Sequence, residues 1–170
     1  LFCQSLKRWA VHIIGTRKAI VESVLLGSEK VLENNGAKLI RSCLETPDGT
    51  ILQSRSRHDY RQHLDANGKT YMLDGGLDYV RCSAHGDEIH HCVWNDDPFD
   101  KIREAMEWGS YGPKGDQPLT YKKLCDMSTE HIEAVLKNVS NILPQFREAF
   151  DLELKLRDSE DASSFIASNN

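Results

Sequence analysis

Four short segments combine residue types that bind ligands or carry out catalysis. The first is residues 57–63, with the sequence RHDYRQH. If this segment is a strand, alternate side chains share a face, which would carry Arg57, Asp59, Arg61 and His63. Two guanidiniums could hold an anion, and a carboxylate beside an imidazole could orient it for base or metal chemistry. The alternative is a polar sheet face held together by Arg–Asp ion pairs.

The second segment, residues 74–81, reads DGGLDYVR and combines a glycine pair with two carboxylates. Glycine allows a sharp turn or a close approach of the backbone to a ligand. Asp74 and Asp78 could bind a cation, although two carboxylates alone are a weak indication of calcium or magnesium. The alternative is a tight turn in which Asp74 accepts backbone hydrogen bonds and Arg81 pairs with an acidic residue.

The third segment, residues 85–92, reads HGDEIHHC and contains several side chains that can bind zinc, with Cys82 close by. Its spacing matches no standard structural zinc site, and the adjacent His90 and His91 would point to opposite sides of an extended chain. The five cysteines are odd in number and widely spaced, which argues against a disulfide framework and favours a reducing cytosol. We therefore predict a polar loop, no structural zinc and no cofactor.

The fourth segment, residues 108–118, is rich in glycine and aromatic residues. Trp108 and Tyr111 could stack on a base while Lys114 meets a phosphate. The alternative is a compact connection between two helices, with Trp108 in the core. We predict that this loop and the arginine-rich segments form one recognition surface, whose ligand-binding residues are Arg57, Asp59, Arg61, Arg81, Trp108, Tyr111 and Lys114.

Turn residues and hydrophobic periodicity predict the elements that must position these segments. Spacings of three and four place apolar residues on one face over residues 6–33, which predicts an N-terminal helix. Short β-rich runs between turns predict a small antiparallel sheet over residues 44–95, with a hairpin at Asn67-Gly68. The fold class expected is α+β, with the sheet flanked by the N-terminal helix and by C-terminal helices.

The C-terminal part is expected to be helical. One helix is predicted over residues 97–109, with Asp97 as its N-cap, a second is capped by Ser128, and a third begins at Pro144. On the last helix, Glu153 and Arg157 have the spacing of an exposed i,i+4 ion pair. The predicted organisation is a helical extension (1–41), an α+β domain (42–157) and a flexible tail (158–170).

Composition and missing motifs limit the function classes. The 21 Lys and Arg residues against 26 Asp and Glu residues give a net charge of −5, which argues against a nucleic-acid coat or a polybasic membrane anchor. No run approaches the roughly 18 apolar residues that a membrane span needs. The sequence also lacks the phosphate-binding loop, the nucleophile elbow and the HExxH zinc motif.

Three blocks of the sequence form a further pattern. They are SRSRHDY (54–60), MLDGGLDYVR (72–81), and a block that begins DPFDKIRE at residue 97 and continues through WGSYG, GDQPL and DMSTEHIEA. In this order they resemble a family of uncharacterised proteins encoded by tailed bacteriophages. The family pattern often places cysteine pairs around the first block, like a zinc ribbon, whereas here Cys43 stands alone. The resemblance therefore implies a degenerate, zinc-ribbon-like sheet held by core packing.

The function expected is that of a non-enzymatic phage accessory protein in the cytoplasm of the infected bacterium. It would bind a host factor or a small anionic, nucleotide-like ligand, with counteraction of a host defence as one role. No membrane is expected, nucleic acid is not the favoured partner, and the N-terminal helix could form a homo-oligomer. Two alternatives stay open: a structural or virion-associated protein, and a metal-dependent nuclease or phosphoesterase that uses His58, Asp59, Asp74 and Asp78.

Overall fold

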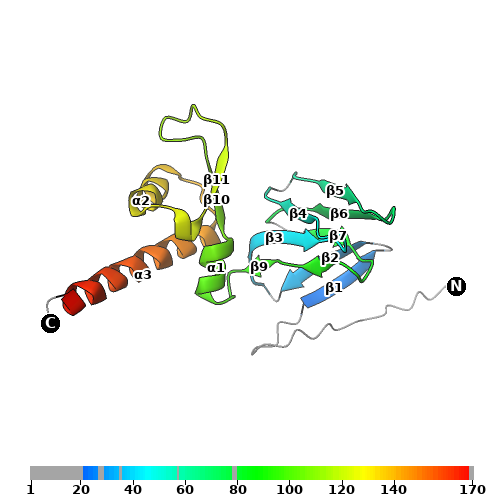
Figure 1. Cartoon of the computed structure of the whole chain (residues 1–170), viewed down its shortest axis with the longest axis horizontal. Coiled ribbons are helices and arrows are strands. Elements are labelled where there is room, and N and C mark those ends of the chain that lie inside the picture. The colour runs from blue at the N-terminus through cyan, green and yellow to red at the C-terminus, as the bar shows by residue number, and fades with distance from the viewer. Residues whose placement is uncertain (1–20, 27–28, 35, 57, 78–79, 169–170) are drawn as a thin grey trace. The chain divides into compact units, whose positions relative to one another are not determined.

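The protein is described by a computed structural model that covers the chain except residues 1–20, 27–28, 35, 57, 78–79 and 169–170 (Figure 1). The predicted α+β class, with small antiparallel sheets, is confirmed. The chain divides into two compact units, unit 1 (residues 1–92) and unit 2 (residues 93–170), and each is described by itself.

Unit 1 contains a five-stranded antiparallel sheet with the order β1-β2-β7-β6-β5. Its strands are β1 (Val21–Leu26), β2 (Glu29–Asn34), β5 (Arg61–Leu64), β6 (Thr70–Asp74) and β7 (Val80–Ser83). A second sheet has the order β4-β3-β8, with β3 (Leu39–Glu45), β4 (Ile51–Ser54) and β8 (Ile89–His90). The core of unit 1 includes Leu39, Ile40, Cys43, Leu44, Leu52, Tyr71, Met72, Leu73, Val80 and Cys82.

The predicted N-terminal helix is wrong over residues 21–26 and 29–33, which lie in β1 and β2. The rest of that prediction, residues 6–20 and 27–28, lies outside the described residues. The antiparallel register places Val24 opposite Val31, and β2 continues into the sheet by placing Leu32 opposite Val80 of β7. This part of the chain therefore belongs to the sheet of unit 1 and is not a separate helical extension, because pairing with a distant strand outweighs the local spacing of apolar residues.

The predicted hairpin at Asn67-Gly68 is confirmed as the turn between β5 and β6. The backbone N–H of Gly68 donates to the carbonyl of Asp65 at 3.0 Å, and Gly68 has a φ of 78°, which favours glycine. Asp65 is buried, and its carboxylate accepts hydrogen bonds from the backbone N–H groups of Asn67 and Lys69 at 2.9 and 2.7 Å. The turn is therefore fixed by its own side chain as well as by glycine.

Unit 2 consists of three α-helices, a β-hairpin and short connecting elements in the described part of the chain. The elements are β9 (Val93–Trp94), α1 (Phe99–Ala105), β10 (Glu107–Ser110), β11 (Thr120–Lys123), the 3₁₀ turn η1 (Leu124–Asp126), α2 (Thr129–Asn138) and α3 (Pro144–Ser168). Its core includes Ile102, Ala105, Met106, Leu124, Met127, Ile132, Val135, Ile142, Phe146, Ala149 and Phe150.

Two helix starts follow the prediction and one does not. Ser128 caps α2 by accepting a hydrogen bond from the backbone N–H of His131 at 3.3 Å, and Pro144 begins α3. Helix α1, in contrast, has Pro98 at its N-cap position, while the Asp97 carboxylate accepts from the backbone N–H of Trp94 and pairs with Lys101.

Two helix ends also differ from the prediction. Helix α1 ends at Ala105, not at Gly109, because residues 107–110 pair as a strand. Helix α3 continues to Ser168, through most of the predicted tail. Among the described residues, no helix is long and apolar enough to span a membrane.

Candidate functional site

The arginine-rich segment holds an internal ion pair in place of a free anion clamp. Asp59 lies before β5, and its carboxylate pairs with the Arg61 guanidinium at 2.7 Å and accepts a hydrogen bond from the backbone N–H of Arg55 at 3.0 Å. His58 is exposed in a turn, and Arg57 lies outside the described residues. The predicted alternation of one continuous strand is therefore wrong for Asp59, and the Arg–Asp pairing that was the alternative is found.

His63 points to a different carboxylate. Its Nε2 lies 2.7 Å from Oδ2 of Asp48, in the turn between β3 and β4, and the Thr46 hydroxyl donates to Oδ1 of Asp48 at 2.5 Å. The hydrogen bonds from His63 and then from Thr46 lower the pKa of Asp48 well below its usual range. This pair joins the β3–β4 turn to β5 on the surface of unit 1.

The glycine pair of the second segment forms a tight turn. Gly76 has a φ of 59°, and its N–H donates to the Ser54 hydroxyl at 3.0 Å. Any Cβ at this position would overlap the backbone carbonyl group of Ser56. Arg81 donates to the Asp74 carboxylate at 2.9 Å, so the ion pair predicted as the alternative is present.

The rival metal site does not assemble in the part that the structure describes. Asp59 and Asp74 pair with different arginines, Arg61 and Arg81, and Asp78 lies outside the described residues. Within the described residues, no three His, Cys, Asp or Glu side chains are placed to hold a metal ion.

The side chains of the histidine-rich segment contact several different residues. His91 Nε2 lies 2.6 Å from a carboxylate oxygen of Glu45, and His90 Nε2 lies 3.7 Å from a carboxylate oxygen of Glu88. The Asp87 carboxylate instead receives the Lys69 ammonium at 2.9 Å and the hydroxyl of the buried Tyr71 at 3.0 Å. The contacts of His91 and Asp87 connect the 85–92 segment to Glu45 of β3 and to Tyr71 of β6.

The aromatic segment of unit 2 is a β-hairpin and not a helix–helix connection. Strands β10 and β11 pair in antiparallel register from Glu107 opposite Lys123 to Ser110 opposite Thr120. The Trp108 ring packs edge-on against the rings of Phe146 and Phe150, with centroids 6.4 and 5.3 Å away. Trp108 therefore anchors the hairpin to α3, which was its alternative role, and its ring is engaged by the core.

The opposite face of this hairpin carries large exposed side chains. Tyr121 stands opposite Gly109, Leu119 lies two residues before Tyr121, and Tyr111 lies two residues after Gly109, which is the spacing of one strand face. Tyr111, Leu119 and Tyr121 are 55%, 42% and 43% exposed. A Cβ on Gly109 would lie 3.0 Å from the Tyr121 ring and 3.2 Å from Leu119, so the glycine lets both side chains lie flat across the strand. We call these three residues the tyrosine face.

The tip of the hairpin is internally bonded. The N–H of Gln117 donates to the carbonyl of Tyr111 at 2.8 Å, and the N–H of Gly115 donates to the carbonyl of Gly112 at 3.1 Å. The Gln117 side chain packs on the backbone at Gly112, where a Cβ would contact the Gln117 amide carbon at 2.5 Å. Lys114 is exposed at the end of the loop. In Figure 1 the tip projects away from the helices of its own unit.

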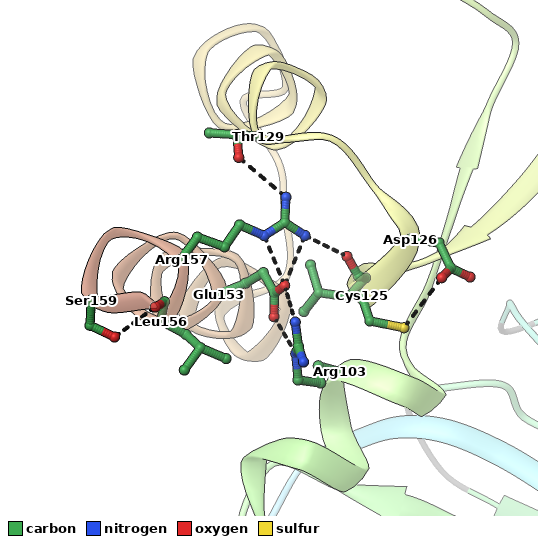
Figure 2. Close-up of polar contacts among 9 residues, drawn as sticks. Arg103, Cys125, Asp126, Thr129, Glu153, Leu156, Arg157 and Ser159 are labelled. Carbon is green, nitrogen blue, oxygen red and sulfur yellow. Dashed lines mark hydrogen bonds and ion pairs between the residues drawn. The ribbon is translucent and has the colours of Figure 1, made fainter. Parts of the chain in front are cut away.

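An ion cluster connects the three helices of unit 2 (Figure 2). Glu153 of α3 is completely buried and receives two hydrogen bonds of 2.7 Å from the Arg103 guanidinium of α1. Arg157 also donates to Glu153, at 2.8 Å, and reaches the Thr129 hydroxyl at 3.3 Å and the Leu124 carbonyl at 3.4 Å. Burial raises the pKa of Glu153, but the hydrogen bonds from the two arginines outweigh burial and leave this pKa below its usual value.

The predicted recognition residues fall in both units. Asp59, Arg61 and Arg81 belong to unit 1, while Trp108, Tyr111 and Lys114 belong to unit 2. Of the predicted residues on the hairpin, Tyr111 and Lys114 are exposed, whereas Trp108 is half-buried against Phe146 and Phe150. Two residues of the tyrosine face, Leu119 and Tyr121, were missed, although their alternation is the spacing of one strand face.

Comparisons with protein-family models, with curated proteins and with solved structures gave no match to this chain.

Proposed function

We propose that this chain is a non-enzymatic phage accessory protein that binds a host protein through the β10–β11 hairpin of unit 2. The observation that carries the proposal is the tyrosine face, where three large hydrophobic side chains are exposed on one hairpin. Tyrosines supply large contact areas at low conformational cost and are enriched among the residues that dominate binding energy. The three sequence blocks that resemble the tailed-phage family support the assignment to a phage.

A protein partner fits this surface better than a small ligand does. The tyrosine face lies on an exposed, projecting hairpin, whereas small ligands bind mostly in concave sites that bury most of their surface. Lys114 at the tip and Lys123, which lies on the same face of β11 as Tyr121, add positive charge around the apolar face. Apolar centres rimmed by charged residues are typical of protein interfaces.

The test places a photo-crosslinking residue at Tyr111 or, as a control, at the equally exposed Tyr60 of unit 1, in the full chain added to a bacterial extract. Tyr60 is 50% exposed, so the two sites differ in location and not in accessibility. We expect one host protein to crosslink from position 111 and not from position 60. The purified host protein should then bind the chain directly.

The same partner provides the quantitative readout. Tyr111→Ser with Tyr121→Ser should weaken its affinity at least about tenfold, whereas Tyr60→Ser with Leu64→Ser should leave it unchanged. Equal losses in both double variants would overturn the proposal. So would native mass spectrometry that finds a small anion retained by the chain and released by Lys114→Glu, because the hairpin would then serve a small ligand.

A further inference from the structure

The β-hairpin of unit 2 has one accessible strand edge. In the described part of this unit the sheet consists of β10 and β11, so each strand has an outer edge. All four residues of β10 are half-buried, while all four residues of β11 are exposed. The outer edge of a strand carries backbone donors and acceptors that can pair with a further strand. β11 is therefore the edge at which such a strand could be added.

The side chains along β11 define what an added strand would meet. Successive side chains alternate, so Tyr121 and Lys123 flank one face of the edge, and Lys122 flanks the other. Leu119 precedes β11 on the Tyr121 face. A strand beside β11 would thus contact apolar surface on one face and an ammonium group on each face.

The lysines select among possible strands. Lys122 stands opposite Trp108, which offers no charge, whereas Lys123 stands opposite Glu107. Burial, and then the positive charge of Lys122, lowers the pKa of His131 on α2. Lysine on an edge strand disfavours pairing with an identical copy, since like charges approach each other, and favours a strand with carboxylates at the facing positions.

We infer that β11 binds an extended acidic segment of the partner protein by strand addition. The segment carries two consecutive Asp or Glu residues opposite Lys123 and Lys122, and apolar residues opposite Tyr121 and Leu119. This inference rests on the proposed function, because the segment belongs to the host protein that the tyrosine face contacts. It adds the mode of binding and the chemistry of the bound segment.

Two capped peptides test the inference on the full chain labelled with ¹⁵N. The acidic probe is Thr-Glu-Glu-Val-Thr-Val, which matches β11 in the antiparallel sense, and the basic probe is Thr-Lys-Lys-Val-Thr-Val. We expect the acidic probe to shift the amide signals of residues 119–123 saturably and to bind at least about tenfold more tightly than the basic probe. Lys122→Glu with Lys123→Glu should reverse this preference, while Lys137→Glu with Lys155→Glu, at exposed positions of α2 and α3, should preserve it.

Some outcomes would overturn the strand-addition inference. These are equal binding of the two probes, shifts confined to residues outside the hairpin, or dimerisation of the free chain through β11. An amide spectrum of each variant that matches the unmodified chain outside the hairpin establishes that it is folded. If the acidic probe fails while the serine variants of the tyrosine face still abolish binding of the host protein, strand addition is wrong and the proposed function stands. If both fail, the proposed function is wrong as well.

Discussion

The buried carboxylate of Glu153 joins α3 to α1 through Arg103, and its second partner, Arg157, reaches α2 and η1. Glu153 lies on the stripe of α3 that also buries Phe146, Ala149 and Phe150, at a spacing where an apolar residue would be expected. Its partner Arg103 comes from α1 and binds both carboxylate oxygens. The sequence predicted an exposed pair with Arg157 alone, because the spacing within a helix cannot reveal a guanidinium that arrives from another helix.

At this residue we predict a large loss of stability on neutralisation. Glu153→Gln leaves two guanidiniums facing an uncharged group, which should lower the free energy of unfolding by about 3 kcal/mol. The control is Glu148→Gln on the exposed side of the same helix, which should change it by less than about 0.5 kcal/mol. Urea denaturation followed by circular dichroism measures both values. Equal values for the two variants would contradict a structural role for the buried carboxylate.

At the scale of elements, the parts that could be predicted are those fixed by neighbours in the chain. The Asn67-Gly68 hairpin follows from turn chemistry, and the start of α2 follows from the capping hydroxyl of Ser128. The ion pair between Arg81 and Asp74 is one of the alternatives that the sequence predicts, because the two residues lie seven positions apart on either side of one turn.

The elements that were missed depend on distant partners. Strand β2 pairs with β7, and β10 pairs with β11. Because each strand is stabilised by pairing with another segment, neither strand is evident from the local spacing of apolar residues. The sequence predicts a helix that ends at Gly109, whereas in the structure the missing side chain of Gly109 accommodates Tyr121 and Leu119. The tyrosine face could therefore be predicted only in part. Tyr111 is evident from its loop, which is rich in glycine and aromatic residues, whereas Leu119 and Tyr121 can be assigned to the same face only when the strand register is known.

Two glycine turns in unit 1 should respond very differently to alanine. Both Gly68 and Gly76 have positive φ, but a Cβ on Gly68 meets open space, whereas one on Gly76 overlaps the Ser56 backbone. Gly68→Ala should cost about 1 kcal/mol for the left-handed conformation alone. Gly76→Ala should cost more than about 3 kcal/mol, since backbone must move as well. Thermal denaturation of the two variants checks the order, and a smaller loss for Gly76→Ala would show that the turn is not packed this closely.

For the whole molecule, protonation acts on both units in the same direction. Several groups have a pKa below the usual value in the folded state, so the unfolded chain takes up protons first. In unit 1, hydrogen bonds from His63 and Lys69 lower the pKa values of Asp48 and Asp87, respectively. In unit 2 the groups with a lowered pKa are Glu130, His131 and Glu153.

The melting temperature should therefore fall as the solution becomes acidic. Stability from a carboxylate with a lowered pKa is complete above its unfolded pKa, 3.8 for Asp and 4.5 for Glu, and is lost as pH falls toward the folded value. His131, whose ordinary pKa is 6.5, adds a shallower decline that begins near that pH. Calorimetry at about pH 7.5, 5.5 and 3.5 should show a small decrease in melting temperature and then a larger one. A melting temperature that is highest at the most acidic point would refute this linkage.

The closed loop at the hairpin tip also bears on the speed of recognition. Two backbone hydrogen bonds, from Gln117 to Tyr111 and from Gly115 to Gly112, close the loop on itself, and the Gln117 side chain packs on Gly112. The conformational entropy of this loop is therefore lost when the chain folds and not when a partner arrives. Association at the tip should be limited by diffusion and orientation, at about 10⁵–10⁷ M⁻¹s⁻¹, without a slower ordering step. Differences in affinity among partners would then be expressed in how long each complex lasts.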